Sequence, residues 1–136
     1  MKKPKNKLRH IEINCPVFKT DLHYVVNCDY KELEKFCKKE FDLDKGENYE
    51  FLSGADGSVL TLKSDSGDIF RVVWLEKFNM SHSRLGVLAH ETTHAVVRIL
   101  DYKGIPYSSQ NNQDETFAYL MDYFISNFIH DYKDTK

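Results

Sequence analysis

Apolar and polar residues alternate over the first part of the chain, after a polar start. The alternating apolar positions are Ile11, Ile13, Leu22, Tyr24 and Val26. Alternation with a period of two is typical of a strand that turns one face to a core. Pro16 interrupts the pattern, so residues 11–26 are predicted to be extended, with an irregular beginning.

The next segment changes to a helical period. Asp29 and Glu32 have the spacing of a capping box, in which each side chain bonds to the backbone of the other residue. Apolar residues then recur at helical intervals, at Leu33, Phe36, Cys37 and Phe41. The pattern predicts an amphipathic helix over residues 30–41.

The middle of the chain predicts strands. A polar loop over residues 42–48 is followed by a short strand at 49–52. Residues 58–63 and 68–76 are rich in β-branched and aromatic side chains, and they flank a turn-forming cluster at 64–67. These two runs predict a β-hairpin.

From Ser81 onward the period is helical again. Ser81 or Ser83 can cap a helix that runs to about Tyr102, and Gly104 followed by Pro106 ends it.

A last helix is predicted to begin near Asn112 or Asp114 and to run to about His130. One face is apolar and consists of Phe117, Leu120, Met121, Phe124 and Phe128. A separate polar stripe carries Glu115, Tyr119, Asp122 and Ser126. Strands followed by helices indicate an α+β fold, with a small antiparallel sheet packed on helices.

Length and charge narrow the classes of function. A chain of 136 residues is typical of one domain, and a formal net charge of −2 excludes a globally basic nucleic-acid binder. Residues 1–10 are predicted to form a flexible basic tail and residues 11–136 a single domain. Three cysteines without metal-finger spacing, and no apolar run of about 20 residues, favour a soluble cytoplasmic protein without a membrane partner.

An HExxH sequence, His90-Glu91-Thr92-Thr93-His94, lies in the middle of the helix predicted from Ser81. Two histidines four residues apart share one helix face, so both imidazoles can bind one Zn²⁺ ion. Glu91 can reach a water at the ion without binding the ion itself, and can act as general base. The competing interpretation is two surface or core histidines beside an incidental glutamate.

A catalytic zinc site takes three protein ligands, and the last helix offers the third. Glu115 follows His94 after twenty intervening residues, enough for a helix end, a turn and the start of a second helix. Two alternatives stay open. Glu115 can complete a capping box with Asn112, or Asp114 can be the ligand if the register differs by one.

Together, His90-Glu91-x-x-His94 and Asp114-Glu115-Thr116-Phe117-Ala118-Tyr119 resemble the gluzincin metallopeptidases. Within that group the similarity is greatest to minimal gluzincins, which include small proteins of phages and prophages. The resemblance covers residues from about 68 to 130. It implies a zincin-like fold and hydrolysis of a peptide or protein substrate, in the cytoplasm of a bacterial or phage-infected cell.

The resemblance also implies roles for individual residues. One Zn²⁺ ion would be held by His90, His94 and Glu115, with Glu91 as the general base. The strand before the zinc helix would form the rim of the substrate cleft, with the residues Arg71, Val72, Val73 and Trp74. Larger gluzincins take the residue that stabilises the oxyanion from a further domain, so the resemblance leaves that residue open.

Supporting roles have several candidates. Asp122, or Asp101, can accept a hydrogen bond from a ligand histidine and orient its ring. The oxyanion candidates, which the sequence does not rank, are Tyr107, Tyr119, Tyr123 and His130.

The alternative function is a non-catalytic or latent zinc-binding module that regulates another protein. A structural site closes its fourth metal position with protein, whereas a catalytic site leaves it open. In a latent form, residues 1–9 or residues 131–136 would occupy the cleft, or the Cys15 thiolate would mask the ion as a fourth ligand.

Overall fold

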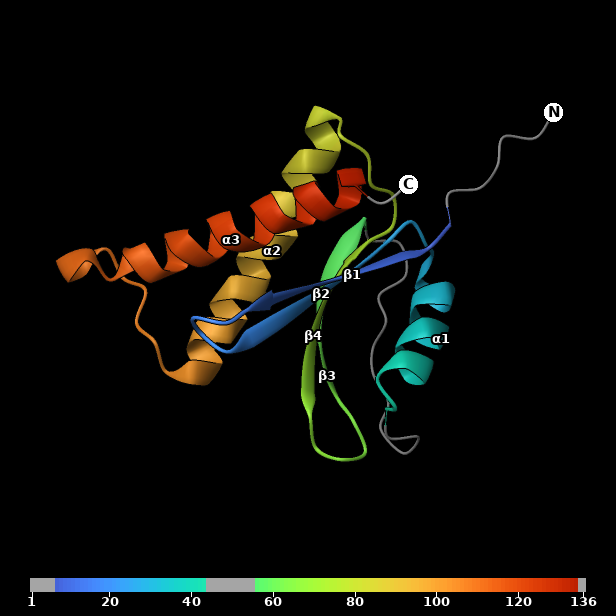
Figure 1. The fold of residues 1–136 in the computed structure, drawn as a ribbon, viewed down its shortest axis with the longest axis horizontal. Coiled ribbons are helices and arrows are strands. Elements are labelled where there is room, and N and C mark those ends of the chain that lie inside the picture. Colours follow the sequence, from blue (N-terminus) through green and yellow to red (C-terminus); the bar gives the residue numbers. More distant parts are fainter. Residues whose placement is uncertain (1–6, 44–55, 135–136) are drawn as a thin grey trace.

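The computed structural model describes residues 7–43 and 56–134, which form an α+β fold (Figure 1). In chain order the elements are β1 (Arg9–Cys15), β2 (Thr20–Val26), α1 (Tyr30–Glu40), β3 (Gly57–Lys63), β4 (Ile69–Leu75), α2 (His82–Lys103), the 3₁₀ turn η1 (Gln110–Asn112) and α3 (Asp114–Asp134). The strands of the described residues form one sheet in the order β1-β2-β4-β3. The strand predicted at residues 49–52 lies outside the described residues.

Two antiparallel strands replace the single extended stretch predicted for residues 11–26. β1 pairs with β2 along its whole length, and the turn between them runs from Pro16 to Lys19. Lys19 adopts φ 48°, a left-handed conformation that lets the chain reverse. β1 also begins inside the predicted tail, because Arg9 Nη1 donates to the carbonyl oxygen of Tyr132 at 3.1 Å and fixes the strand start against α3.

The sheet is mixed, so the prediction of an antiparallel sheet is wrong in one of its ladders. β3 and β4 form the predicted antiparallel hairpin. β2 and β4 run parallel, with His23 beside Val72 at one end of the ladder and Val26 beside Leu75 at the other. The parallel ladder forms because the hairpin returns with β4, not β3, beside β2, which leaves β3 at the edge of the sheet.

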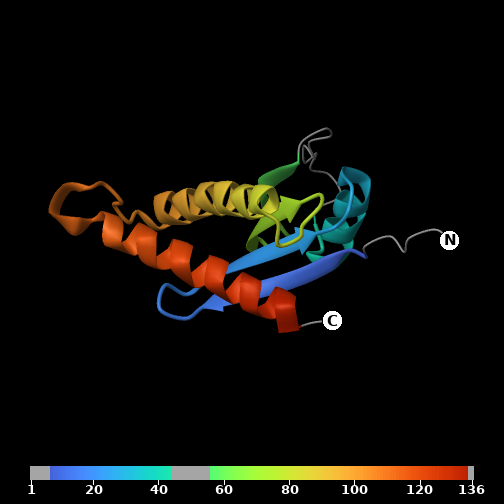
Figure 2. The same cartoon turned by 90° about the horizontal axis from the view of Figure 1, so that it is seen from above.

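Helices cover both faces of the sheet. α1 lies on one face, and α2 and α3 lie on the other (Figures 1 and 2). On the α1 face, Trp74 is buried and its Nε1 donates to the carbonyl oxygen of Cys28 at 2.9 Å. On the other face, the hydroxyls of Tyr24 and Thr92 share a buried hydrogen bond of 2.9 Å. That bond fixes the turn of α2 that contains the histidine motif.

The α-helices of the described residues match the predicted ranges closely. α1 has the predicted capping box of Asp29 and Glu32. α2 follows the N-cap Ser81 and ends at Gly104, whose φ of 68° is the left-handed conformation common after helices. α3 continues four residues beyond the predicted end at His130. Within the ranges that the structure describes, none of the helices is both long and apolar enough to cross a membrane.

Candidate functional site

α2 presents His90 and His94 on its exposed side. The opposite side is buried through Leu88, Thr92, Ala95, Val96 and Ile99. The two imidazole rings meet edge to face with their centroids 4.8 Å apart, and their Nε2 atoms are 3.3 Å apart. The His90 side chain is 67% exposed, so both rings converge at a point that solvent can reach.

The separation of these two nitrogens fits a zinc ion. Two imidazole nitrogens, each about 2.05 Å from Zn²⁺ and at the tetrahedral angle, lie about 3.3 Å apart. The observed distance between the Nε2 atoms of His90 and His94 is 3.3 Å. Without an ion the same spacing allows a hydrogen bond from one neutral imidazole to the other. The spacing of the pair is therefore compatible both with two ligands of one ion and with a hydrogen bond between the two rings.

Glu91 lies between the histidine pair and the start of β3. It is buried, at 8% exposure, and its Oε1 is 3.9 Å from His90 Nε2. A Cβ atom on Gly57 would lie 3.1 Å from Glu91 Cγ and 2.8 Å from the carbonyl oxygen of Trp74. A glycine at position 57 is therefore what allows β3 to lie directly against this glutamate.

Two pockets border Glu91, and Gly57 lines both. The first, of about 410 Å³, also contains His90 and Asp56. The second, of about 210 Å³, also contains His94 and Arg98. The three residues of the motif therefore open on a groove that follows the start of β3 along α2.

Arg98 is a residue of this groove that the sequence interpretation missed. Its Nη1 donates to the carbonyl oxygen of Val59 at 2.7 Å and ties the edge strand β3 to α2. The signal was present, since Arg98 follows His94 by the same four residues that separate the two histidines, which places all three on one helix face.

The strand beside the groove is β3, so the prediction that Arg71, Val72, Val73 and Trp74 form the rim is wrong. These four residues belong to β4 and are buried; Val72, Val73 and Trp74 are paired with β2 on one side and β3 on the other, and Arg71 is paired with β3. β4 therefore has no free edge along this ladder that could pair with a substrate. β3 has one neighbour among the described strands, β4.

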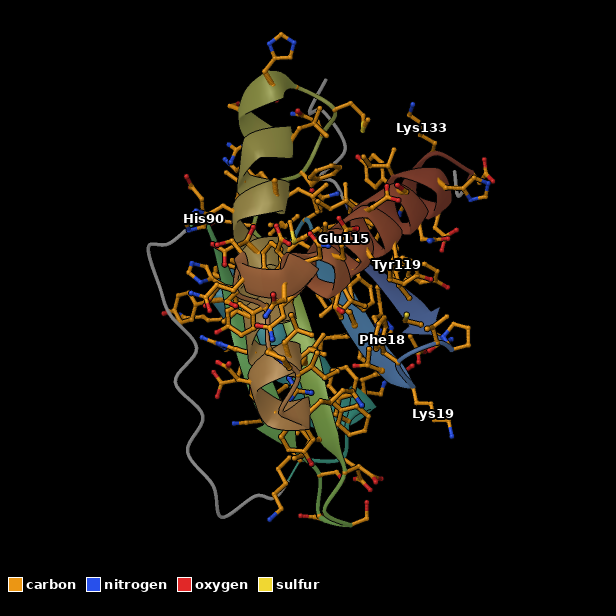
Figure 3. The ribbon with its side chains drawn as sticks, turned by 90° about the vertical axis from the view of Figure 1, so that its left-hand side faces the viewer. Phe18, Lys19, His90, Glu115, Tyr119 and Lys133 are labelled. Atoms are coloured by element: carbon orange, nitrogen blue, oxygen red, sulfur yellow. The ribbon has the colours of Figure 1, made fainter. Side chains whose placement is uncertain are left out.

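Glu115 does not join the histidines in this structure. It is exposed on the first turn of α3, and Figure 3 shows His90 on one side of α2 and Glu115 on the other, where α3 packs. Within residues 7–43 and 56–134, no three side chains of His, Cys, Asp or Glu form a group that could hold a metal ion. The alternative Asp114, also exposed on that turn, is included in this finding.

The other predicted residues have different partners. The Tyr107 hydroxyl donates to Asp101 Oδ1 at 3.0 Å, and this bond raises the pKa of Tyr107. Asp122 accepts a hydrogen bond from the Ser126 hydroxyl at 3.0 Å. Among the described residues, the hydrogen-bond partners of the Asp101 and Asp122 carboxylates are therefore hydroxyl groups and not histidines.

On α3, Tyr123 donates to the carbonyl oxygen of Asn14, Tyr119 packs on Phe18, and a hydrogen bond with Asp131 raises the pKa of His130. Cys15 is buried in the core of the α2 and α3 face. The residues predicted for the oxyanion or as a masking ligand thus line neither pocket beside Glu91; they are Tyr107, Tyr119, Tyr123, His130 and Cys15.

Comparison with protein-family models, with curated proteins and with solved structures found no match for this chain.

Proposed function

We propose that this protein is a zinc-dependent hydrolase of peptide bonds, in which His90 and His94 hold the ion and Glu91 is the general base. The observation that carries the proposal is the 3.3 Å distance between the two Nε2 atoms, which fits two nitrogens on one tetrahedral ion. His90 and His94 are two of the three protein ligands in this proposal. The third ligand is a separate part of the proposal.

When bound, the ion supplies Lewis acidity that polarises the substrate carbonyl and raises the acidity of water. In this proposal Glu91 deprotonates that water, because its Oε1 lies 3.9 Å from His90 Nε2, beside the point where the two histidine rings converge. Its carboxylate accepts the proton of the attacking water and delivers it to the amine that leaves.

The substrate in this proposal is an extended peptide that adds to the outer edge of β3, where the described residues place no further strand. Strand addition uses backbone hydrogen bonds and needs an open sheet edge close to the reacting groups. β3 meets both conditions, since it is the edge strand and its first residues line the pockets with His90, Glu91 and His94. Arg98, through its bond to Val59, holds this edge in register with the histidines.

Two carboxylates are alternative candidates for the third zinc ligand. Glu115 has the spacing of the family motif, but it reaches the histidines only if the first turn of α3 moves. Asp56 lines the same pocket as His90 and Glu91, and it too would have to move to join the two histidines. Zinc titration of Glu115→Gln and Asp56→Asn distinguishes them, because only loss of the true ligand weakens zinc binding.

The test of the metal site is calorimetric zinc titration of the full chain and of His94→Ala. The wild type should bind one equivalent, and His94→Ala should bind at least about a hundredfold more weakly, since even outer contacts of metal ligands change affinity 10- to 100-fold. His82→Ala is the matched control, because His82 is exposed on the first turn of the same helix. Equal zinc affinity in all three proteins would refute the site.

The test of catalysis is hydrolysis of a quenched peptide library by the wild type and by Glu91→Gln. We expect Glu91→Gln to keep zinc and to lose hydrolysis by a factor of about 10²–10⁴, the usual contribution of a general base. Full activity in Glu91→Gln would contradict the proposed mechanism.

A non-catalytic zinc module is the second candidate. It is favoured by the finding that the described residues bring only two ligands together. In that case the wild type binds zinc, and neither it nor Glu91→Gln cleaves any member of the library.

A further inference from the structure

A second site, remote from the histidine motif, lies where β2 and β4 part. The parallel ladder between these strands begins at His23 and Val72, although β2 starts at Thr20 and β4 at Ile69. Their first residues are therefore not paired with each other, and Figure 1 shows the strands diverging toward their starts. A pocket of about 450 Å³ occupies this slot, a volume typical of small-molecule sites.

Arg71 is the central cation of the slot. It is 8% exposed, and its Nε is buried without a hydrogen-bond partner. The guanidinium lies 4.8 Å from the ring centroid of Tyr102, at the end of α2, and no described residue forms an ion pair with it. Buried donors are almost always satisfied, so the unpaired Nε marks Arg71 as a cation that lacks an acceptor within the part of the chain that the structure describes.

The rim of the slot adds positive charge. Lys19 and Lys103 line the pocket from the β1–β2 turn and from the last turn of α2. Two carboxylates line it as well, so the three cations and two acids leave a net charge of +1. Both acids have polar neighbours: Ser66 donates to Asp68, and the Asn14 amide, oriented to satisfy both of its ends, donates to Asp21.

We propose that this slot binds the phosphate group of a small phosphate monoester, with Arg71 as the principal contact and Lys19 and Lys103 at the rim. Arginine offers parallel N–H donors that match two phosphate oxygens, and Arg71 lines the pocket without an ion-pair partner among the described residues. The pocket has room for a phosphate together with a small organic group. The site uses no residue of the histidine motif, so it stands or falls independently of the proposed hydrolase.

The experiment measures the thermal midpoint of the full chain against inorganic phosphate, glycerol 3-phosphate and acetate at constant ionic strength. Both phosphates should raise the midpoint in a saturable way, because a ligand that binds only the folded state stabilises it. Acetate should not. A response to inorganic phosphate without one to glycerol 3-phosphate would overturn the assignment to a monoester, and an equal response to acetate would overturn the assignment to phosphate.

Substitutions of the lining residues test whether phosphate binds in this slot. Arg71→Lys keeps the charge but loses the paired donors, and should weaken phosphate binding by about tenfold. Lys103→Gln, at an exposed position that leaves the fold intact, should weaken it by several-fold. Lys133→Gln is the control with the same change of charge, since Lys133 is exposed, does not line the pocket and lies well away from Lys19 in Figure 3. Unchanged binding in Arg71→Lys and Lys103→Gln would overturn the proposal, and the second variant decides if the first does not fold.

Discussion

Gly57 is the residue on which the geometry of the candidate site depends most directly. A side chain there would meet the carbonyl oxygen of Trp74 at 2.8 Å, and a backbone atom in a sheet cannot easily move away. The strand start would have to shift, and the two pockets that Gly57 lines beside Glu91 would change shape. A position with no chemistry of its own therefore controls the groove.

We predict that Gly57→Ala destabilises the protein by about 1–3 kcal/mol, the usual cost of overpacking. Urea unfolding measures this directly. Gly86→Ala is the matched control, because a Cβ atom there meets nothing within 4 Å. Gly86 lies inside α2, so its replacement should stabilise the protein by about 0.5–1 kcal/mol. Loss of stability of equal size in both variants would show that the contact at Gly57 is not the cause.

A second residue-scale feature is the histidine pair on the other face of the sheet. His10 Nε2 and His23 Nδ1 are 2.9 Å apart, and His23 is surrounded by the rings of Phe41 and Phe70. Two effects lower the pKa of His23 to about 4: burial is the larger, and the neighbouring His10 is the smaller. The folded state therefore holds this imidazole neutral where an unfolded chain would already protonate it.

The sign of the pH effect follows from that pKa. Between pH 6.5 and about 4 the unfolded state binds the extra proton, so stability is full above pH 6.5 and falls as the pH drops through this window. We predict a loss of up to about 3 kcal/mol attributable to His23. Urea unfolding at pH 7, 5.5 and 4 measures it, and His23→Phe should flatten the curve. His82→Gln, at an exposed position, should leave it unchanged.

At the scale of elements, the important contact is the one between α2 and the edge strand β3. Arg98 donates to Val59 across this junction, and β3 has no second neighbour among the described strands to hold it. We predict that Arg98→Gln destabilises the protein by about 1.5–3 kcal/mol, the value of one hydrogen bond that involves a charged group. The loss should fall locally on β3.

Hydrogen exchange tests this locality. The amides of β3 should exchange faster in Arg98→Gln, whereas the amides of β2, paired on both sides, should keep their protection. Arg84→Gln, on the first turn of α2, serves as the control for charge. Equal acceleration in β2 and β3 would mean that Arg98 stabilises the whole domain and not the edge.

The elements also show what the sequence could predict. The helices were predictable because their caps and periods are local: Asp29 with Glu32 starts α1, and Gly104 ends α2. The β3–β4 hairpin was predictable for the same reason. The place of β4 beside β2 was not, since that ladder joins His23 to Val72 across α1 and β3, and no local pattern records it.

Some residues of the candidate site could likewise be predicted from the sequence, and others could not. His90, Glu91 and His94 share one helix turn, so their spacing alone was enough to place them together. Gly57 and Arg98 acquire their roles only when β3 packs on α2, and the distance from Glu115 to the histidines depends on how residues 104–113 turn. The roles of Gly57, Arg98 and Glu115 depend on contacts between elements, and the alternation or helical period of a sequence does not predict such contacts.

At the scale of the whole molecule, one sheet separates two cores. Trp74 lies in the core under α1, and the hydrogen bond of Tyr24 and Thr92 lies in the core under α2 and α3. Adjacent residues of β2, Tyr24 and Val25, face the two cores in turn, so neither core can loosen without disturbing the strands of the other. The prediction of a single domain for residues 11–136 therefore becomes a statement about cooperativity.

We predict that Tyr24→Phe lowers stability by about 1–2 kcal/mol, because it leaves the buried hydroxyl of Thr92 without its partner. Urea unfolding followed by Trp74 fluorescence, on the opposite face, should show the same shift as unfolding followed by far-UV circular dichroism. The double variant Tyr24→Phe with Thr92→Val should recover most of the loss, since no unpaired polar group then remains. If the fluorescence transition stays at the wild-type midpoint while the dichroism transition moves, the two faces unfold separately and the single-domain prediction is wrong.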